Sequence, residues 1–99
     1  MFNKEMLSKL QEMKSQANES KNRLAEIKIS EESGGGLVRI TMDGNRNLKS
    51  VEINADLKTL DKEDLEDLLV VAFKRTLDKV NEINEKEVMA SAQNLFPGM

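Results

Sequence analysis

The chain has 99 residues, a formal net charge of −3 and 38% hydrophobic residues, and it has no Cys, His, Trp or Tyr. This size fits one domain, so we expect residues 1–99 to form a single domain with a modest core. The missing side chains exclude thiol nucleophiles, imidazole acid–base catalysis and Cys/His metal sites, so we expect no enzyme activity and no cofactor. Because no apolar run approaches the roughly 20 residues of a membrane span, and no signal-peptide pattern opens the chain, we expect no membrane partner. The absence of Cys fits a reducing cytoplasm.

The first predicted element is a helix over residues 3–23. Its apolar side chains recur at alternating spacings of four and three, which places them on one helix face, at Met6, Leu10, Met13, Ala17 and Leu24. Glu19 and Arg23 have the i, i+4 spacing of an ion pair on a helix surface.

Alternating apolar and polar residues then predict three strands, near residues 27–30, 37–42 and 48–53. Val38 and Ile40 share one face of the second strand, and Val51 and Ile53 share one face of the third. A glycine run separates the first two strands, and Asp43-Gly44-Asn45, whose residues tolerate positive φ, separates the last two. We therefore expect an antiparallel meander.

The glycine run Gly34-Gly35-Gly36 could also be interpreted as a phosphate-binding loop. No Lys-Ser or Lys-Thr pair follows it, and no helix is predicted to begin there. Its place between two alternating segments favours a hairpin turn.

The last predicted element is a helix from Asp61 to about residue 91, with Asp61 as its N-cap. Its first half is apolar on nearly all sides, so we expect a core or dimer contact from Leu65, Leu68, Leu69, Ala72 and Phe73, together with Val38, Ile40, Val51 and Ile53. At 1.5 Å per residue this helix would be about 45 Å long, more than one small core covers, so its second half must project or pack on another chain. For residues 91–99 we predict a flexible tail.

The first turns of this helix are acidic, with a cluster at Asp61, Glu63, Asp64, Glu66 and Asp67. Such a cluster could bind a divalent cation, but it lacks the spacing of a calcium loop. Negative charge at a helix N-terminus is explained by the helix dipole, so we expect no metal site.

Basic side chains are the remaining candidates for a binding site. Lys14 and Lys21 lie seven residues apart and share a helix face, with Arg23 nearby, and a second group consists of Lys74, Arg75, Lys79 and, two turns further on, Lys86. Spacing alone favours ordinary surface ion pairs, in particular Arg75–Asp78 and Glu82–Lys86.

The order of elements and several short strings resemble the YbaB/EbfC family of bacterial nucleoid-associated proteins. The matching strings are Met1-Phe2 at the start, Glu32-Ser33-Gly34-Gly35-Gly36-Leu37-Val38, the turn Asp43-Gly44-Asn45, Val51-Glu52-Ile53, Glu66-Asp67-Leu68-Leu69-Val70-Val71-Ala72-Phe73 and the ending Leu95-Phe96-Pro97-Gly98-Met99. The resemblance implies an α+β fold in the order α-β-β-β-α, and a cytoplasmic homodimer with a tweezer-like outline.

The same resemblance implies binding to double-stranded DNA with low sequence preference, a place in the nucleoid, and no small-molecule substrate. Mapped onto this chain, the DNA contacts would be Lys14, Lys21, Arg23, Lys74, Arg75, Lys79 and Lys86. One alternative stays open, because helix–hairpins–helix also resembles prefoldin-type subunits. In that case the apolar helix arms would bind other proteins, as in a chaperone or adaptor.

Overall fold

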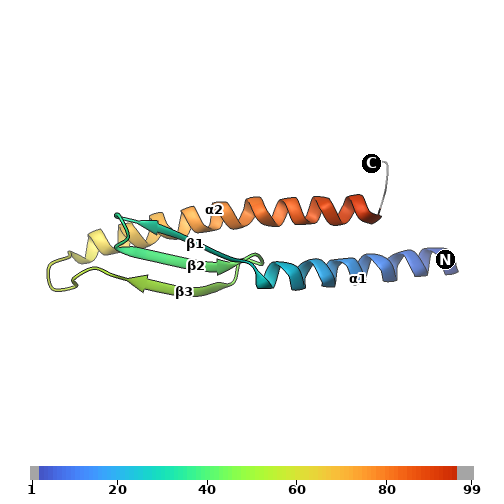
Figure 1. Ribbon diagram of the computed structural model, residues 1–99, viewed down its shortest axis with the longest axis horizontal. Coiled ribbons are helices and arrows are strands. Elements are labelled where there is room, and N and C mark those ends of the chain that lie inside the picture. Colours follow the sequence, from blue (N-terminus) through green and yellow to red (C-terminus); the bar gives the residue numbers. More distant parts are fainter. Residues whose placement is uncertain (1–2, 96–99) are drawn as a thin grey trace.

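A computed structural model describes residues 3–95 of the chain. It contains, in order, α1 (Lys4–Glu26), β1 (Lys28–Ser33), β2 (Val38–Asp43), β3 (Leu48–Ile53) and α2 (Lys62–Leu95). The molecule is elongated, 66 × 22 × 21 Å, and α2 runs first along the sheet and then beside α1 (Figure 1). The expected α+β fold with α-β-β-β-α order is confirmed. We call α1 together with residues 84–95 of α2 the arm.

Helix α1 begins at a side-chain cap, because Asn3 Oδ1 accepts a hydrogen bond from the Met6 N–H at 2.8 Å. It ends at Glu26, three residues later than predicted, where Ile27 turns extended with φ −80° and ψ 131°. Within α1 only Ser20 and Leu24 are buried. The helix is therefore held at its C-terminal end, and the rest of it projects along the arm.

The sheet is an antiparallel meander in the order β1-β2-β3. Ser33 pairs with Val38 next to the first turn, and Val38 pairs in turn with Ile53 across the sheet. The central strand β2 buries Val38, Ile40 and Met42, and these side chains form the core with residues of α2. The predicted inner face of β2 is thus confirmed.

Helix α2 packs its first half across this sheet. Ala72, Thr76 and Val80 are fully buried, and the expected core residues Leu65, Leu68 and Leu69 pack against them while partly exposed. The Ser33 hydroxyl donates to the Leu68 carbonyl at 2.6 Å, which ties the end of β1 to the helix. The helix follows Asp61, as predicted, but it continues to Leu95, past the expected end near residue 91. Residues 96–99 of the expected tail, like Met1-Phe2, lie outside the described residues.

The two turns of the meander use glycine in different ways. Gly34, Gly35 and Gly36 have φ of 63°, 67° and 97°, which confirms the hairpin interpretation of the glycine run. In the second turn the positive φ belongs to Arg46, at 69°, and not to Asp43, Gly44 or Asn45 as we expected. Gly44 is needed there for close packing, since a Cβ at this position would lie 2.8 Å from the Leu24 carbonyl oxygen.

The first half of α2 is not enclosed by its own chain. Phe73 is 42% exposed and Val70 is 66% exposed, although both belong to the apolar stretch that we expected to be buried on more than one side. Val51 and Ile53, on β3, are 43% and 40% exposed. In a single chain these residues therefore form a surface, and their predicted role in a dimer contact remains a prediction.

Within residues 3–95 no helix is apolar and long enough to cross a membrane.

Candidate nucleic-acid interface

The β2–β3 turn places the two arm helices relative to each other. Asn45 Nδ2 donates to the Lys21 carbonyl of α1 at 2.9 Å, and Asn84 Nδ2 of α2 donates to the Gly44 carbonyl at 3.0 Å. The Gly44 N–H also donates to the Leu24 carbonyl at 2.9 Å. These three contacts fix the base of the arm, and Lys14 of α1 and Lys86 of α2 lie beyond this base.

Lys14 and Lys21 form a cationic face on α1. Both are exposed on α1, and their seven-residue spacing puts them on one face, about 10 Å apart along the axis. Throughout residues 3–95, no carboxylate oxygen lies within the 4.0 Å limit of an ion pair with either ammonium group. They can therefore meet an external anion without breaking an internal ion pair.

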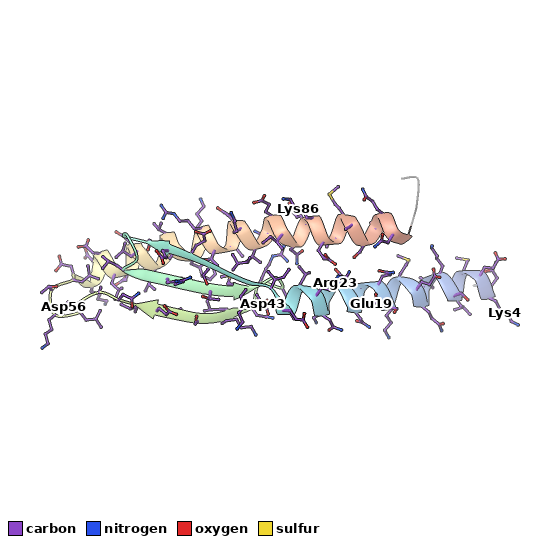
Figure 2. The ribbon with its side chains drawn as sticks, viewed as in Figure 1. Lys4, Glu19, Arg23, Asp43, Asp56 and Lys86 are labelled. Carbon is purple, nitrogen blue, oxygen red and sulfur yellow. The ribbon has the colours of Figure 1, made fainter. Side chains whose placement is uncertain are left out.

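Arg23 does not join this face. It follows Lys21 by two residues, about 200° around the helix, and the predicted pair with Glu19 does not form. Instead Arg23 crosses to α2, where its Nη2 lies 2.6 Å and its Nε 2.9 Å from Glu87 Oε1. Figure 2 shows Arg23 near the sheet end of α1, far from Lys4 at the tip of the arm.

The pairing of Arg23 changes the titration of its partner. The hydrogen bond from Arg23 lowers the pKa of Glu87, against the raising effect of burial and with smaller help from the Ser20 hydroxyl and the charge of Arg23. Glu87 is thus firmly ionised at neutral pH. The sequence offers no local signal for this pair, because its members are 64 residues apart.

The cations of α2 divide between two flanks. Arg75, Lys79 and Lys86 share one flank, since spacings of four and eleven residues return to nearly the same direction. Lys74 lies on another flank, where it borders an apolar hollow. Lys74 and Lys79 are exposed, and neither forms an ion pair with a described residue.

The two other α2 cations have internal partners. Lys86 Nζ lies 3.4 Å from Glu82 Oε1, as the spacing predicts, and both side chains are largely exposed. Arg75 Nη1 donates to the Glu32 carbonyl at 2.9 Å, so the expected pair with Asp78 is wrong. A surface pair such as Lys86–Glu82 is worth at most about 1 kcal/mol, so a phosphate could displace Glu82. Arg75 is instead engaged in joining α2 to β1.

A second surface lies at the edge of the core, between β3 and the first half of α2. Here a hollow of about 510 Å³ is bordered mainly by apolar side chains: Ile40, Leu48, Val51, Leu69, Val70, Phe73, Lys74 and Leu77. Val70, Leu48, Val51 and Phe73 are each more than two-fifths exposed. Such a continuous apolar surface is typical of an interaction site.

The acidic start of α2 does not assemble a metal site in the part of the chain that the structure describes. Within residues 3–95, no three Asp or Glu side chains are grouped closely enough to hold a metal ion. Its negative charge lies at the helix N-terminus, where the helix dipole accounts for it.

A three-stranded meander packed on one long helix, with a projecting helical arm, defines a class of α+β proteins. The comparisons place the chain within that class. Residues 1–95 match the YbaB/EbfC DNA-binding family, and the chain belongs to this family.

Relatives with the same extent support the assignment. A nucleoid-associated protein of Flavobacterium johnsoniae is 38% identical over 94 residues, covering 95% of this chain and 88% of that protein. A nucleoid-associated protein of Neisseria meningitidis serogroup C is 37% identical over 97 residues, covering 95% and 87%. A crystal structure of an uncharacterized protein from Helicobacter pylori has the same fold, with a TM-score of 0.78 at 22% identity, covering 91% of this chain and 97% of that one.

These findings confirm, at the level of the family, the prediction of a nucleoid-associated DNA-binding protein. The family is defined by DNA binding and not by a catalytic activity. The family assignment does not identify the residues of this chain that contact DNA.

Proposed function

We propose that the protein binds duplex DNA in the bacterial nucleoid, as a cytoplasmic homodimer whose arms contact the phosphate backbone with low sequence preference. The single observation that carries this proposal is the pair Lys14 and Lys21, exposed on one face of α1 and without a carboxylate partner in the described region. Lysine is a compact point charge that suits phosphate, whereas base readout needs hydrogen bonds to base edges in a groove.

The net charge of −3 is compatible with this proposal because the charges are unevenly distributed. Helix α1 carries five Lys and Arg against four Glu, whereas α2 carries five against eight acids. We therefore assign the main phosphate contact to α1, with Lys86 of the arm and Lys79, which precedes the arm on the same flank of α2, as additional contacts. Binding of this kind is weak and strongly weakened by salt.

The homodimer is proposed from the apolar hollow beside β3. Among residues 3–95 only six hydrophobic side chains are buried, which is a small core for a chain of this length. A second copy presents the same apolar surface, so a two-fold contact would cover Val51, Val70 and Phe73 of both chains at once. Each whole chain, residues 1–99, then acts as one domain, and each dimer presents two arms to the duplex.

The test is an electrophoretic shift of a 30-base-pair duplex with the double variant Lys14→Glu/Lys21→Glu. We expect its affinity at low salt to fall at least ten-fold, because two contacts per arm become repulsive. The matched control is Lys58→Glu/Lys62→Glu, which makes the same charge change near the β3–α2 connection. Figure 2 places Asp56, in that connection, at the opposite end of the molecule from Lys4.

The two double variants test whether the Lys14–Lys21 face is the DNA contact, and not whether the family binds DNA. Equal losses in both double variants would show that net charge alone governs binding, which would contradict the assigned face. Undiminished binding by Lys14→Glu/Lys21→Glu would contradict it directly.

A second candidate function is favoured by exposed apolar side chains on the arm. Met6, Leu7 and Leu10 of α1 are each nearly half exposed, and Val88 and Met89 of α2 are more than half exposed. In this alternative the arms would hold a partner protein, as a chaperone or adaptor does. Suppression of the aggregation of an unfolded client, unchanged between 50 mM and 300 mM salt and unaffected by Lys14→Glu/Lys21→Glu, would support this alternative against DNA binding.

A further inference from the structure

The two helices of the arm are joined, within the described residues, by a single ion pair. Arg23 of α1 directs two donors, Nε and Nη2, at one oxygen of Glu87 of α2, at 2.9 Å and 2.6 Å. The other ion pairs of the described chain join residues of one helix or of neighbouring strands. This contact lies just beyond the Asn84–Gly44 hydrogen bond at the base of the arm.

The two partners differ in how far they reach solvent. The Arg23 side chain is 51% exposed and the Glu87 side chain is 22% exposed. An external anion can therefore approach the guanidinium, and its Nη1 has no hydrogen bond to any described residue. A guanidinium binds carboxylate and phosphate with the same donor geometry, so a phosphate oxygen is a direct competitor for Glu87.

We propose that Glu87 masks Arg23 from DNA, so that the arginine makes no phosphate contact when the protein binds a duplex. The masking limits the number of phosphates that each arm neutralises, so it keeps the affinity for DNA low and the dependence of that affinity on salt shallow. This inference rests on the proposed binding of DNA by the arms. It assigns Glu87 the role of a residue that tunes affinity, and it removes Arg23 from the cations that contact DNA directly.

The test is the salt dependence of duplex affinity for Glu87→Gln, which removes the charge that holds Arg23 and keeps the side-chain shape. One freed arginine adds about 0.9 to the magnitude of the slope of log affinity against log salt. We expect this increase for each arm in contact, and tighter binding at low salt. Glu85→Gln is the matched control, because Glu85 is exposed on the same helix and removing it changes the net charge equally.

Two arginine variants complete the experiment. Arg23→Ala should leave the slope of the natural protein unchanged, and adding it to Glu87→Gln should abolish the increase. The proposal would be overturned if the slope for Glu87→Gln equalled that for Glu85→Gln. It would also be overturned if Arg23→Ala alone gave a slope of smaller magnitude than that of the natural protein. Circular dichroism of each variant confirms that the helices are intact before the titration.

Failure of this inference differs from failure of the proposed function. If Lys14→Glu/Lys21→Glu weakens binding while Glu87→Gln and Glu85→Gln behave alike, only the masking is contradicted. If Lys14→Glu/Lys21→Glu leaves binding unchanged, the assigned face of α1 is not the DNA contact, and the proposed binding mode is contradicted whatever the slope of Glu87→Gln.

Discussion

Asp43 is the most deeply buried carboxylate described in the chain, with its side chain 2% exposed at the end of β2. Its Oδ1 accepts hydrogen bonds from the backbone N–H groups of Asn45 and Asn47 at 2.8 and 3.0 Å, and its Oδ2 accepts one from Asn47 Nδ2 at 3.0 Å. Burial acts to raise the pKa of Asp43, but the Asn47 side chain, the two backbone groups and Lys49 together lower it. The ionised carboxylate thus organises the turn that carries the base of the arm.

This arrangement predicts a pH dependence for the Asp43→Asn variant. The folded pKa is lower than the unfolded value of about 3.9, so the stabilisation is complete above about pH 4 and is lost as pH falls through the folded pKa. We expect the variant to be less stable by about 1–3 kcal/mol at pH 7, and the difference to shrink between pH 4 and pH 2. Urea unfolding at fixed protein concentration measures it, and a difference that stays constant down to pH 2 would contradict the assignment.

Single residues were predicted unequally well from the sequence. The shared face of Lys14 and Lys21 follows from helical spacing alone, because both positions belong to one helix and need no distant partner, whereas their contact with DNA stays a prediction. Arg23 does not, since its partner Glu87 comes into reach only when α1 and α2 lie side by side. The role of Gly44 was missed for the same reason, because it depends on the approach of Leu24 from another element.

At the scale of elements, periodicity predicted the type and order of all five. The strands and helices were found because their apolar residues repeat every two or every three to four positions. Their ends were less accurate: α1 continues to Glu26 and α2 to Leu95. The extension of α1 consists of Leu24, Ala25 and Glu26, which favour helices, and the extra turn places Leu24 against Gly44.

The exposed face of α2 yields a prediction about assembly. In a single chain Val70 is 66% exposed, so Val70→Lys costs a monomer little, whereas in the proposed dimer it places a charge in an apolar contact. We expect the dimer dissociation constant to rise at least ten-fold in sedimentation equilibrium. Val88→Lys, at the 56% exposed Val88 of the arm, is the control and should leave it unchanged. A natural protein that sediments as a monomer at 50 μM, or a Val70→Lys variant that dimerises equally well, would contradict the proposed interface.

At the scale of the whole molecule, the fold separates two surfaces along its long axis. At one end the sheet lies beside the first half of α2, and at the other end α1 lies beside the end of α2 (Figure 1). The first region carries the apolar hollow, and the second carries the exposed cations Lys14, Lys21 and Lys86. Joining two chains at the first surface leaves the arms of both free for the duplex. The long α2 connects the two functions, because it is the element that borders both surfaces.

The central claim is that DNA contacts the arm, and the most direct test is to map the contact on the protein. The measurement is the change in backbone amide NMR shifts when the ¹⁵N-labelled protein is titrated with a 20-base-pair duplex. We predict the largest changes around Lys14 and Lys21, smaller ones around Lys79 and Lys86, and reversal of both in 0.5 M salt. Largest changes on β1–β3, or in the connection at residues 54–61, with the arm unaffected, would contradict the claim.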